Sequence, residues 1–140
     1  RFIKKYHAIV HGNFENDELT GLVDEPIGKI DSGVKRGVIP DGKSAQTEYK
    51  VLKQVSGASL VELRLLTGRT HQIRVHMAYL GHPLYGDQLY GIKDPFSRQA
   101  LNCFYLSFPD PFNSEKNKTV EIPDPADMQK LWQGLINKKF

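Results

Sequence analysis

The stretch of sequence that decides the fold reads TGRTHQIRVHMAYLGHPLYGDQLYG and occupies residues 67–91. Basic, aromatic and glycine residues are denser here than in an ordinary core segment. A strand-like run at 60–66 leads into it, and apolar residues at helical spacing predict an amphipathic helix from about Thr70 to Leu80. Gly81 is then expected to end the helix.

The predicted helix carries one apolar stripe with an arginine beside it. Ile73, Met77 and Leu80 fall at i, i+4 and i+7, so one side of the helix is expected to face a core. Arg74 lies about a hundred degrees around the helix from Ile73, at the edge of this stripe. An arginine in that position can reach across a cleft.

Positive charge gathers around this helix. Arg64, Arg69 and Arg74 lie close together in the sequence, with Glu62 as the nearby counter-charge. Over the whole chain, nineteen Lys and Arg against sixteen Asp and Glu give a net charge of only +3. An electropositive surface is therefore expected at this place rather than everywhere, and polyanions are its natural partners.

Short motifs follow one another in a fixed order around the helix. Three belong to the stretch quoted above: GRTHQIRVH at 68–76, GHPL at 81–84 and GD at 86–87. Two precede it: KYHA at 5–8, followed by Gly12, and GKSAQT at 42–47. In this order they resemble the RluA-type pseudouridine synthases over residues 4–91. The resemblance implies an α+β fold, in which a mixed, mainly antiparallel β-sheet carries the motif helix and a C-terminal helix beside an RNA cleft.

The resemblance also implies an enzyme that isomerises uridine to pseudouridine in structured RNA, either ribosomal or transfer RNA. The reaction cuts the glycosidic bond, rotates the base and rejoins it through carbon, using an aspartate nucleophile and no metal or cofactor. By the same resemblance, Tyr6 stacks on the target base and helps to move a proton, and Arg74 holds the aspartate in a charge-assisted pair. Without it, Tyr6 is more simply a tyrosine packed on a sheet and Arg74 a solvated surface charge.

Further candidate contacts lie at the start of the helix. Arg69, His71 and Gln72 are candidates for binding RNA phosphates or bases through side chains and free backbone N–H groups. Ile73 is either an apolar wall against the base or plain core. Thr67 or Thr70 is expected only to cap the helix.

Two residues outside the helix have mainly structural interpretations. Asp87 is expected to accept backbone hydrogen bonds in a turn that begins at Gly86. Lys43 follows a glycine but lacks the rest of a nucleotide-binding loop, so nucleotide hydrolysis is not supported. Lys43 is instead free to contact an RNA backbone if its loop folds over a substrate.

One part of the family's pattern is absent. The catalytic aspartate belongs to an Arg-Leu-Asp-x-x-Thr-Ser-Gly motif that precedes the tyrosine motif, and this sequence has none. Asp31, in KIDSG at 29–33, follows Tyr6 at the wrong spacing and is a poor candidate for the nucleophile. Because the chain also begins with Arg1 inside a strand-like pattern, we expect residues 1–140 to form one partial catalytic domain without its N-terminal portion, inactive alone.

Two consequences follow from this expectation. The first is an alternative function, a self-contained RNA-binding module that keeps the synthase fold without its chemistry. The second concerns assembly, because missing upstream strands would leave exposed sheet edges. Dimerisation, or association with a separate N-terminal piece, is expected through those edges.

The remaining elements are predicted from local patterns. Alternating residues predict strands at 2–11, 19–24, 46–55, 60–66, 101–108 and 119–122. The first two are expected to form an antiparallel pair, and the third and fourth a hairpin. Segment 27–44 has almost no apolar periodicity and predicts a long, exposed loop. Asp124 as N-cap and Pro125 at the first helical position predict a C-terminal helix.

Composition excludes several classes of protein. The single cysteine, Cys103, rules out an internal disulfide, and its apolar neighbours predict a buried strand thiol in a reducing, cytoplasmic compartment. No apolar run approaches the ~18 residues that cross a membrane. His71 and His76 lie five apart with no carboxylate between them, which does not match a helical zinc pair.

Overall fold

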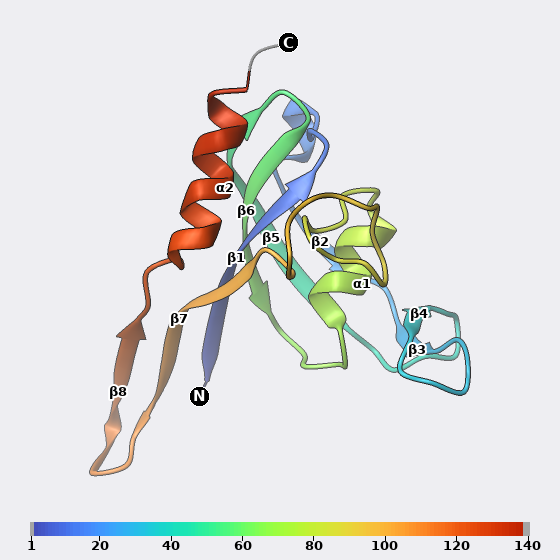
Figure 1. Ribbon diagram of the computed structural model, residues 1–140. Helices are drawn as coiled ribbons and strands as arrows, with labels where there is room; N and C mark the ends of the chain where they lie inside the picture. Colours follow the sequence, from blue (N-terminus) through green and yellow to red (C-terminus); the bar gives the residue numbers. More distant parts are fainter. Residues whose placement is uncertain (1, 139–140) are drawn as a thin grey trace.

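The computed structural model describes residues 2–138. Within these residues the main body is a six-stranded sheet in the order β2-β5-β6-β1-β7-β8, with every pairing antiparallel. A separate two-stranded hairpin, β3–β4, projects from it (Figure 1). The elements in chain order are β1 (Ile3–His11), the 3₁₀ turn η1 (Asn16–Glu18), β2 (Thr20–Asp24), β3 (Ile27–Lys29), β4 (Arg36–Val38), β5 (Gln46–Val55), β6 (Ala58–Leu65), α1 (Gln72–Tyr79), β7 (Leu101–Asp110), β8 (Asn113–Glu121) and α2 (Ala126–Ile136).

Strand β1 lies inside the sheet, with β6 on one side and β7 on the other. Tyr6 is opposite Leu63 of β6 and Cys103 of β7. The predicted pairing of the first two strands is therefore wrong, because β2 pairs with β5 instead. The local β5–β6 hairpin, which turns through Gly57 at φ +80°, places β6 against β1. Both sides of β1 are then occupied, and β2 lies at the outer edge.

The two helices cover opposite faces of the sheet. Successive side chains of β1 point to opposite faces, and they pack against different helices. Ala8 and Val10 belong to the buried cluster that includes Met77 of α1. Ile9, between them, belongs to the cluster that includes Trp132 of α2. Figure 1 shows the strands lying between the two helices. The sheet is thus buried on both faces over its centre.

Helix α1 starts and ends slightly inside the predicted span. Its apolar stripe is confirmed, since Ile73 and Met77 are buried in the core. Its end at Gly81 is confirmed as well. With φ at +88°, Gly81 donates its N–H to Ala78 O at 3.0 Å, and His82 donates to Met77 O at 2.8 Å. This pair of bonds satisfies the last free carbonyls of the helix in a Schellman motif.

Segment 27–44 is a folded hairpin rather than the open loop that its composition predicts. Ile27 pairs with Val38, and its N–H and C=O both bond to Lys43 at 2.9 and 2.8 Å. A Cβ on Gly42 would come within 2.6 Å of the Ile27 carbonyl carbon, so glycine permits this close approach. Ile27 packs with Val75 of α1, and this tertiary contact supplies the burial that no local periodicity reveals.

The C-terminal segment differs from the prediction in two details. Strand β8 begins at Asn113, earlier than expected, because it continues the β7 hairpin directly. Helix α2 begins one residue later than predicted, with Pro125 as N-cap and no side-chain cap. Asp124 is engaged elsewhere, since it accepts hydrogen bonds from His7 Nδ1 and from Asn102 Nδ2, each at 2.9 Å. Because Asp124 bonds to these distant residues, its side chain does not cap α2.

Three further observations concern residues 2–138 only. No helix there is long and apolar enough to cross a bilayer. No group of three or more His, Cys, Asp or Glu side chains is placed to hold a metal ion. Cys103 is half-buried rather than buried.

Candidate active site

The turn before α1 is held against β5 by one buried amide. Gln72 is only 2 % exposed. Its Nε2 donates to Gln46 O and to Thr47 Oγ1, both at 2.9 Å, and its Oε1 accepts from Thr67 Oγ1 at 2.8 Å and from Arg69 N at 3.0 Å. All four hydrogen bonds of the Gln72 amide are therefore made within the protein. The geometry gives Gln72 the role of fixing the turn, while its predicted contact with RNA stays a prediction.

Residue 71 has an unusual backbone conformation. His71 is the N-cap of α1 at φ +58°, the only non-glycine residue with positive φ among the described residues, and it makes no side-chain cap. Such conformations are uncommon and concentrate at functional sites. The predicted capping by Thr67 or Thr70 is therefore wrong: Thr67 bonds to Gln72 instead, and the N-cap position belongs to His71.

The His71 ring is held by a tyrosine. Its Nδ1 lies 2.7 Å from the Tyr90 hydroxyl, which also accepts the N–H of Arg36 at 2.9 Å. The hydroxyl proton is thus available for Nδ1 of a neutral imidazole. Burial, followed by the positive charges of Arg74 and Arg36, lowers the pKa of His71 below its ordinary value. Neutral His71 is the form that this arrangement favours.

Arg74 is locked in a two-pronged ion pair with Asp87. Arg74 Nε donates to Asp87 Oδ2 and Arg74 Nη2 to Asp87 Oδ1, both at 2.9 Å. The Asp87 side chain is fully buried, whereas that of Arg74 is 15 % exposed. The Tyr90 ring lies 5.0 Å from the guanidinium carbon. One edge of the guanidinium is therefore fixed by the protein, and the side chain still reaches the surface.

Asp87 is held as a carboxylate despite its burial. Burial acts to raise its pKa, but hydrogen bonds from Arg74 and from the N–H groups of Tyr90 and Leu89 outweigh it, so the pKa of Asp87 lies below its ordinary value. The predicted backbone bonds in this turn are confirmed. The ion pair with Arg74 was not predicted from sequence, because the two residues lie on different elements with no shared periodicity.

Tyr6 and Ile73 lie on the same side of the sheet. Tyr6, next to an irregularity in the β1–β7 register, packs against the cluster that includes Ile73. Ile73 is 5 % exposed, which supports the plain-core interpretation. Burial, and to a smaller extent the neighbouring Cys103, raises the pKa of Tyr6. The phenol therefore keeps its proton at neutral pH.

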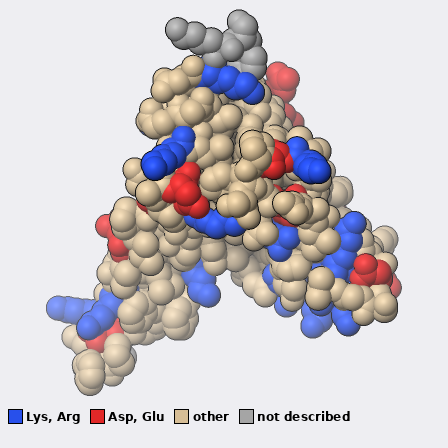
Figure 2. Space-filling view, viewed as in Figure 1, with Lys and Arg blue, Asp and Glu red and all other residues tan. Residues whose placement is uncertain are grey.

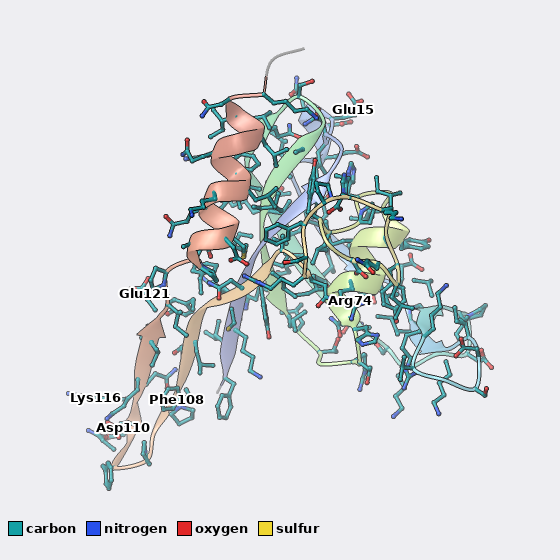
Figure 3. All side chains as sticks on the ribbon, in the orientation of Figure 1. Glu15, Arg74, Phe108, Asp110, Lys116 and Glu121 are labelled. Atoms are coloured by element: carbon teal, nitrogen blue, oxygen red, sulfur yellow. The ribbon has the colours of Figure 1, made fainter. Side chains whose placement is uncertain are left out.

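Arg74 lies between two arms of the molecule. In Figure 3 it sits near the start of α1, with the β7–β8 hairpin on one side and the β3–β4 hairpin on the other. The space-filling view shows a hollow between these arms, and Lys and Arg side chains gathered over the β3–β4 arm (Figure 2). On this face, Lys and Arg side chains also lie on the β7–β8 arm and on the body, and the β3–β4 arm carries the densest group (Figure 2).

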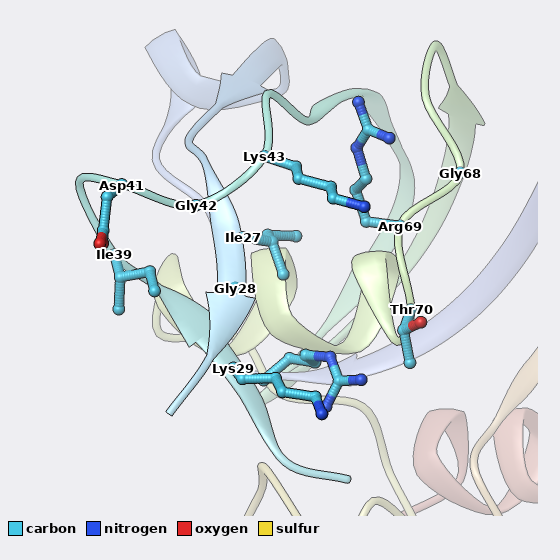
Figure 4. Close-up of a pocket in the computed structure, with 11 residues that line it drawn as sticks. Ile27, Gly28, Lys29, Ile39, Asp41, Gly42, Lys43, Gly68, Arg69 and Thr70 are labelled. Carbon is cyan, nitrogen blue, oxygen red and sulfur yellow. The ribbon is translucent and has the colours of Figure 1, made fainter. Parts of the chain in front are cut away.

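Arg69 belongs to this basic region. Its Nε donates to Ser44 O at 2.7 Å, which leaves the outer nitrogens of the guanidinium for other partners. Arg69 lines an open cavity of about 480 Å³ together with Lys43 (Figure 4). The structure therefore places four of the predicted site residues around one turn and helix, namely Arg69, His71, Gln72 and Arg74. It adds Asp87 and Tyr90, which sequence reasoning left as turn residues or did not single out.

Comparison with proteins of known sequence places the chain in a family. The profile of the family described as RNA pseudouridylate synthase matches residues 1–79. An uncharacterized RNA pseudouridine synthase of Bacillus subtilis, YjbO, is 47% identical over 133 residues, which cover 94% of this chain and 46% of that protein. The ribosomal large subunit pseudouridine synthase D of Nitrosomonas europaea is 38% identical over 149 residues, covering 98% and 42%. The chain thus spans somewhat under half the length of these relatives.

A solved structure shows the same architecture. The protein named human RNA pseudouridylate synthase domain containing 1 superposes with a TM-score of 0.76 at 28% identity, over 99% of this chain and 67% of that one. The fold class expected from sequence is confirmed, as is the resemblance carried by the motifs. Because the family profile covers more than half of the sequence, the chain belongs to the RNA pseudouridylate synthase family.

Proposed function

We propose that the protein to which this chain belongs isomerises uridine to pseudouridine in structured RNA. The observation that carries the proposal is the guanidinium of Arg74, which is fixed along one edge by Asp87 and remains accessible. An arginine has five N–H donors, and the two bonds to Asp87 leave three. Those three can hold a second carboxylate, which is the task that the family resemblance implies for Arg74.

The chemistry requires an ionised aspartate close to the sugar of the target uridine. A charge-assisted pair with Arg74 keeps such a carboxylate ionised and oriented. Tyr6, whose raised pKa keeps it a phenol, is suited to stack on the base and to help move a proton late in the reaction. Residues 1–140 lack the aspartate motif, so under this proposal they form a partial catalytic domain that is inactive alone.

The other predicted residues take supporting parts in the proposal. Arg69 and His71 contact RNA near the start of α1 through their side chains. Gln72 acts by fixing the turn that carries them, and Ile73 by packing beneath Tyr6. Ribosomal RNA is favoured over transfer RNA as substrate, because several relatives are named ribosomal large subunit pseudouridine synthase D. Action in the cytoplasm, without metal or cofactor, completes the proposal.

Replacement of Arg74 tests the proposal. In the full-length protein, Arg74→Ala should lower the rate of tritium release from RNA labelled at C5 of uridine by at least about a hundredfold, because the nucleophile loses its oriented charge partner. Lys130→Ala removes an exposed cation of α2, on the opposite face of the sheet, and it should keep most of the activity. Equal activities of the two variants would contradict the role given to Arg74.

The second candidate function, an RNA-binding module without chemistry, is separated by the same assay. Full-length protein that binds RNA tightly but releases no tritium would favour it. Association through the sheet edges also stays a prediction. Strands β2 and β8 form the two edges of the described sheet, and light scattering of the purified chain checks whether it is a dimer or carries a bound peptide.

A further inference from the structure

An open cavity lies beside the candidate active site. It is bounded by the β3–β4 hairpin, the Gly42-Lys43 turn and the turn before α1, and its volume is about 480 Å³. Four cationic side chains and one acidic side chain contribute to its lining; these are Lys29, Arg36, Lys43, Arg69 and Asp41. In Figure 4, Asp41 lies on the far side of β3 from Lys43 and Arg69. Positive charge therefore dominates the interior of the cavity.

These positive charges have no ion-pair partner in the described part of the chain. Among residues 2–138, none of the four cationic side chains forms an ion pair. Arg69 bonds through Nε to the backbone oxygen of Ser44, and Arg36 bonds through Nη1 to the backbone oxygens of Gly33 and Val34. Neutral backbone acceptors orient the two guanidinium groups without cancelling their charge. A concave surface lined in this way concentrates field lines and attracts anions.

The cavity is tied to Arg74 through Tyr90. The Tyr90 hydroxyl accepts the N–H of Arg36 in β4 at 2.9 Å and lies 2.7 Å from His71 Nδ1 at the start of α1. Its ring lies 5.0 Å from the guanidinium carbon of Arg74. One tyrosine thus joins the hairpin, the helix start and the candidate catalytic arginine. These contacts fix the position of the basic cavity relative to Arg74.

We propose that this cavity binds the sugar–phosphate backbone of the RNA strand that carries the target uridine, and that Tyr90 keeps the bound backbone in register with Arg74. This inference rests on RNA as the substrate, and it adds a specific anchoring site to that proposal. Lysine and arginine side chains suit phosphate oxygens as point charges and as forked donors, respectively. Such contacts position a nucleic acid without reading its sequence.

A matched pair of double variants tests the site. Lys29→Ala/Lys43→Ala removes two charges from the cavity, and Lys53→Ala/Lys130→Ala removes two exposed charges from β5 and α2. Binding of a fluorescently labelled structured RNA to the full-length protein is measured by anisotropy at several salt concentrations. The cavity variant should bind about tenfold or more weakly, and the slope of log K against log salt should fall by about 1.5, since each lost phosphate contact removes roughly 0.7–0.9.

The control variant and a competitor sharpen the result. The control should stay within about twofold of the unmodified protein in affinity, and both variants should melt at the same temperature as it does, because the exchanged side chains lie on the surface. Uridine monophosphate in excess should not displace the RNA if an extended backbone is the ligand. Displacement at equal phosphate concentration would overturn the proposal in favour of a free-nucleotide site.

The outcomes separate this inference from the proposed function. Unchanged affinity and salt slope in the cavity variant, in a protein that still isomerises uridine, would overturn the anchoring site and leave the chemistry intact. A cavity-dependent salt slope in a protein that releases no tritium would support the anchoring site and remove the chemistry. Absence of any RNA binding by the unmodified protein would overturn both.

Discussion

The ion pair between Arg74 and Asp87 contributes to stability and also orients the arginine of the proposed active site. Removing one partner of a buried pair leaves a charge without compensation, which costs about 3–5 kcal/mol. Because Arg74 keeps some exposure, we expect Asp87→Asn to lower the free energy of unfolding by about 3 kcal/mol, at the lower end of that range. Urea unfolding measures the change. Asp41→Asn, at an exposed aspartate, is the control and should stay within about 0.5 kcal/mol. Equal stability of the two variants would mean that the Arg74–Asp87 pair does not stabilise the fold.

His76 makes stability depend on pH. It is fully buried, with Nδ1 2.8 Å from Thr47 Oγ1 and Nε2 2.9 Å from Glu25 O. Thr47 Oγ1 also accepts from Gln72, so its own proton is directed at Nδ1, and a second proton there has no acceptor. Burial lowers the pKa of His76, and this outweighs the backbone bond to Glu25 and the charges of Glu25 and Asp24, which act to raise it. The neutral imidazole is therefore the form that the fold requires.

The sign of the pH effect follows from this lowered pKa. The unfolded chain takes up the proton near pH 6.5, whereas the folded chain takes it up only at lower pH, so stability falls as pH drops below about 6.5. Between pH 7.5 and 5.5 the loss from this group is up to about 1.4 kcal/mol. Urea unfolding across that range should show a shallower fall in His76→Gln, which cannot titrate. Parallel curves for the two proteins would assign the pH dependence to other groups.

At the scale of elements, the turn after α1 depends on one glycine. Gly86 has φ +76°, and a Cβ there would lie 1.7 Å from Arg98 O. We expect Gly86→Ala to cost at least about 2 kcal/mol, since it adds backbone strain to a clash with main chain. Gly134 in α2 has open space around its Cβ position, so Gly134→Ala should instead stabilise by about 0.5–1 kcal/mol. Denaturant midpoints compare the two, and similar signs would refute the geometric argument.

The β3–β4 hairpin is linked to the start of α1 by the Tyr90 hydroxyl, besides its packing on Val75. Tyr90→Phe removes the hydroxyl that links Arg36 to His71 and should speed amide hydrogen exchange in 27–38, while the β1–β6 pairs stay protected. Tyr79→Phe, at an exposed tyrosine in the last turn of α1, is the matched control. Exchange in the hairpin that is equal in both variants would show that other contacts hold the arm.

At the scale of the whole molecule, the proposed function depends on how the two hairpins are placed around α1. The sheet buries its centre between α1 and α2, and the β3–β4 and β7–β8 hairpins extend from this body (Figure 1). The charged arm and the candidate catalytic arginine are connected through Tyr90 rather than through neighbouring sequence. RNA that enters between the arms would therefore contact the basic cavity and Arg74, whose relative positions are fixed through Tyr90.

Local patterns were enough for much of this architecture. The helical stripe of Ile73 and Met77, the stop at Gly81 and the β5–β6 hairpin all depend on spacing within a few residues, and all are present. The motif order was sufficient to indicate the family. These features were predictable because periodicity, turn chemistry and short motifs are written in consecutive residues.

Long-range choices were decided only in three dimensions. Whether β1 pairs with β2 or with β6 and β7 depends on competition among strands, which no single segment encodes. The hairpin at 27–44 gains its burial from Val75, and Asp124 gives up a helix cap for His7. Asp87 and Tyr90 look like ordinary turn residues until the fold brings them to Arg74. Local sequence thus determined the family and most of the elements. The β3–β4 hairpin, the pairing of the strands and the partners of the site's charged groups arose from tertiary packing, because burial and hydrogen-bond satisfaction are settled among residues that are distant in the chain.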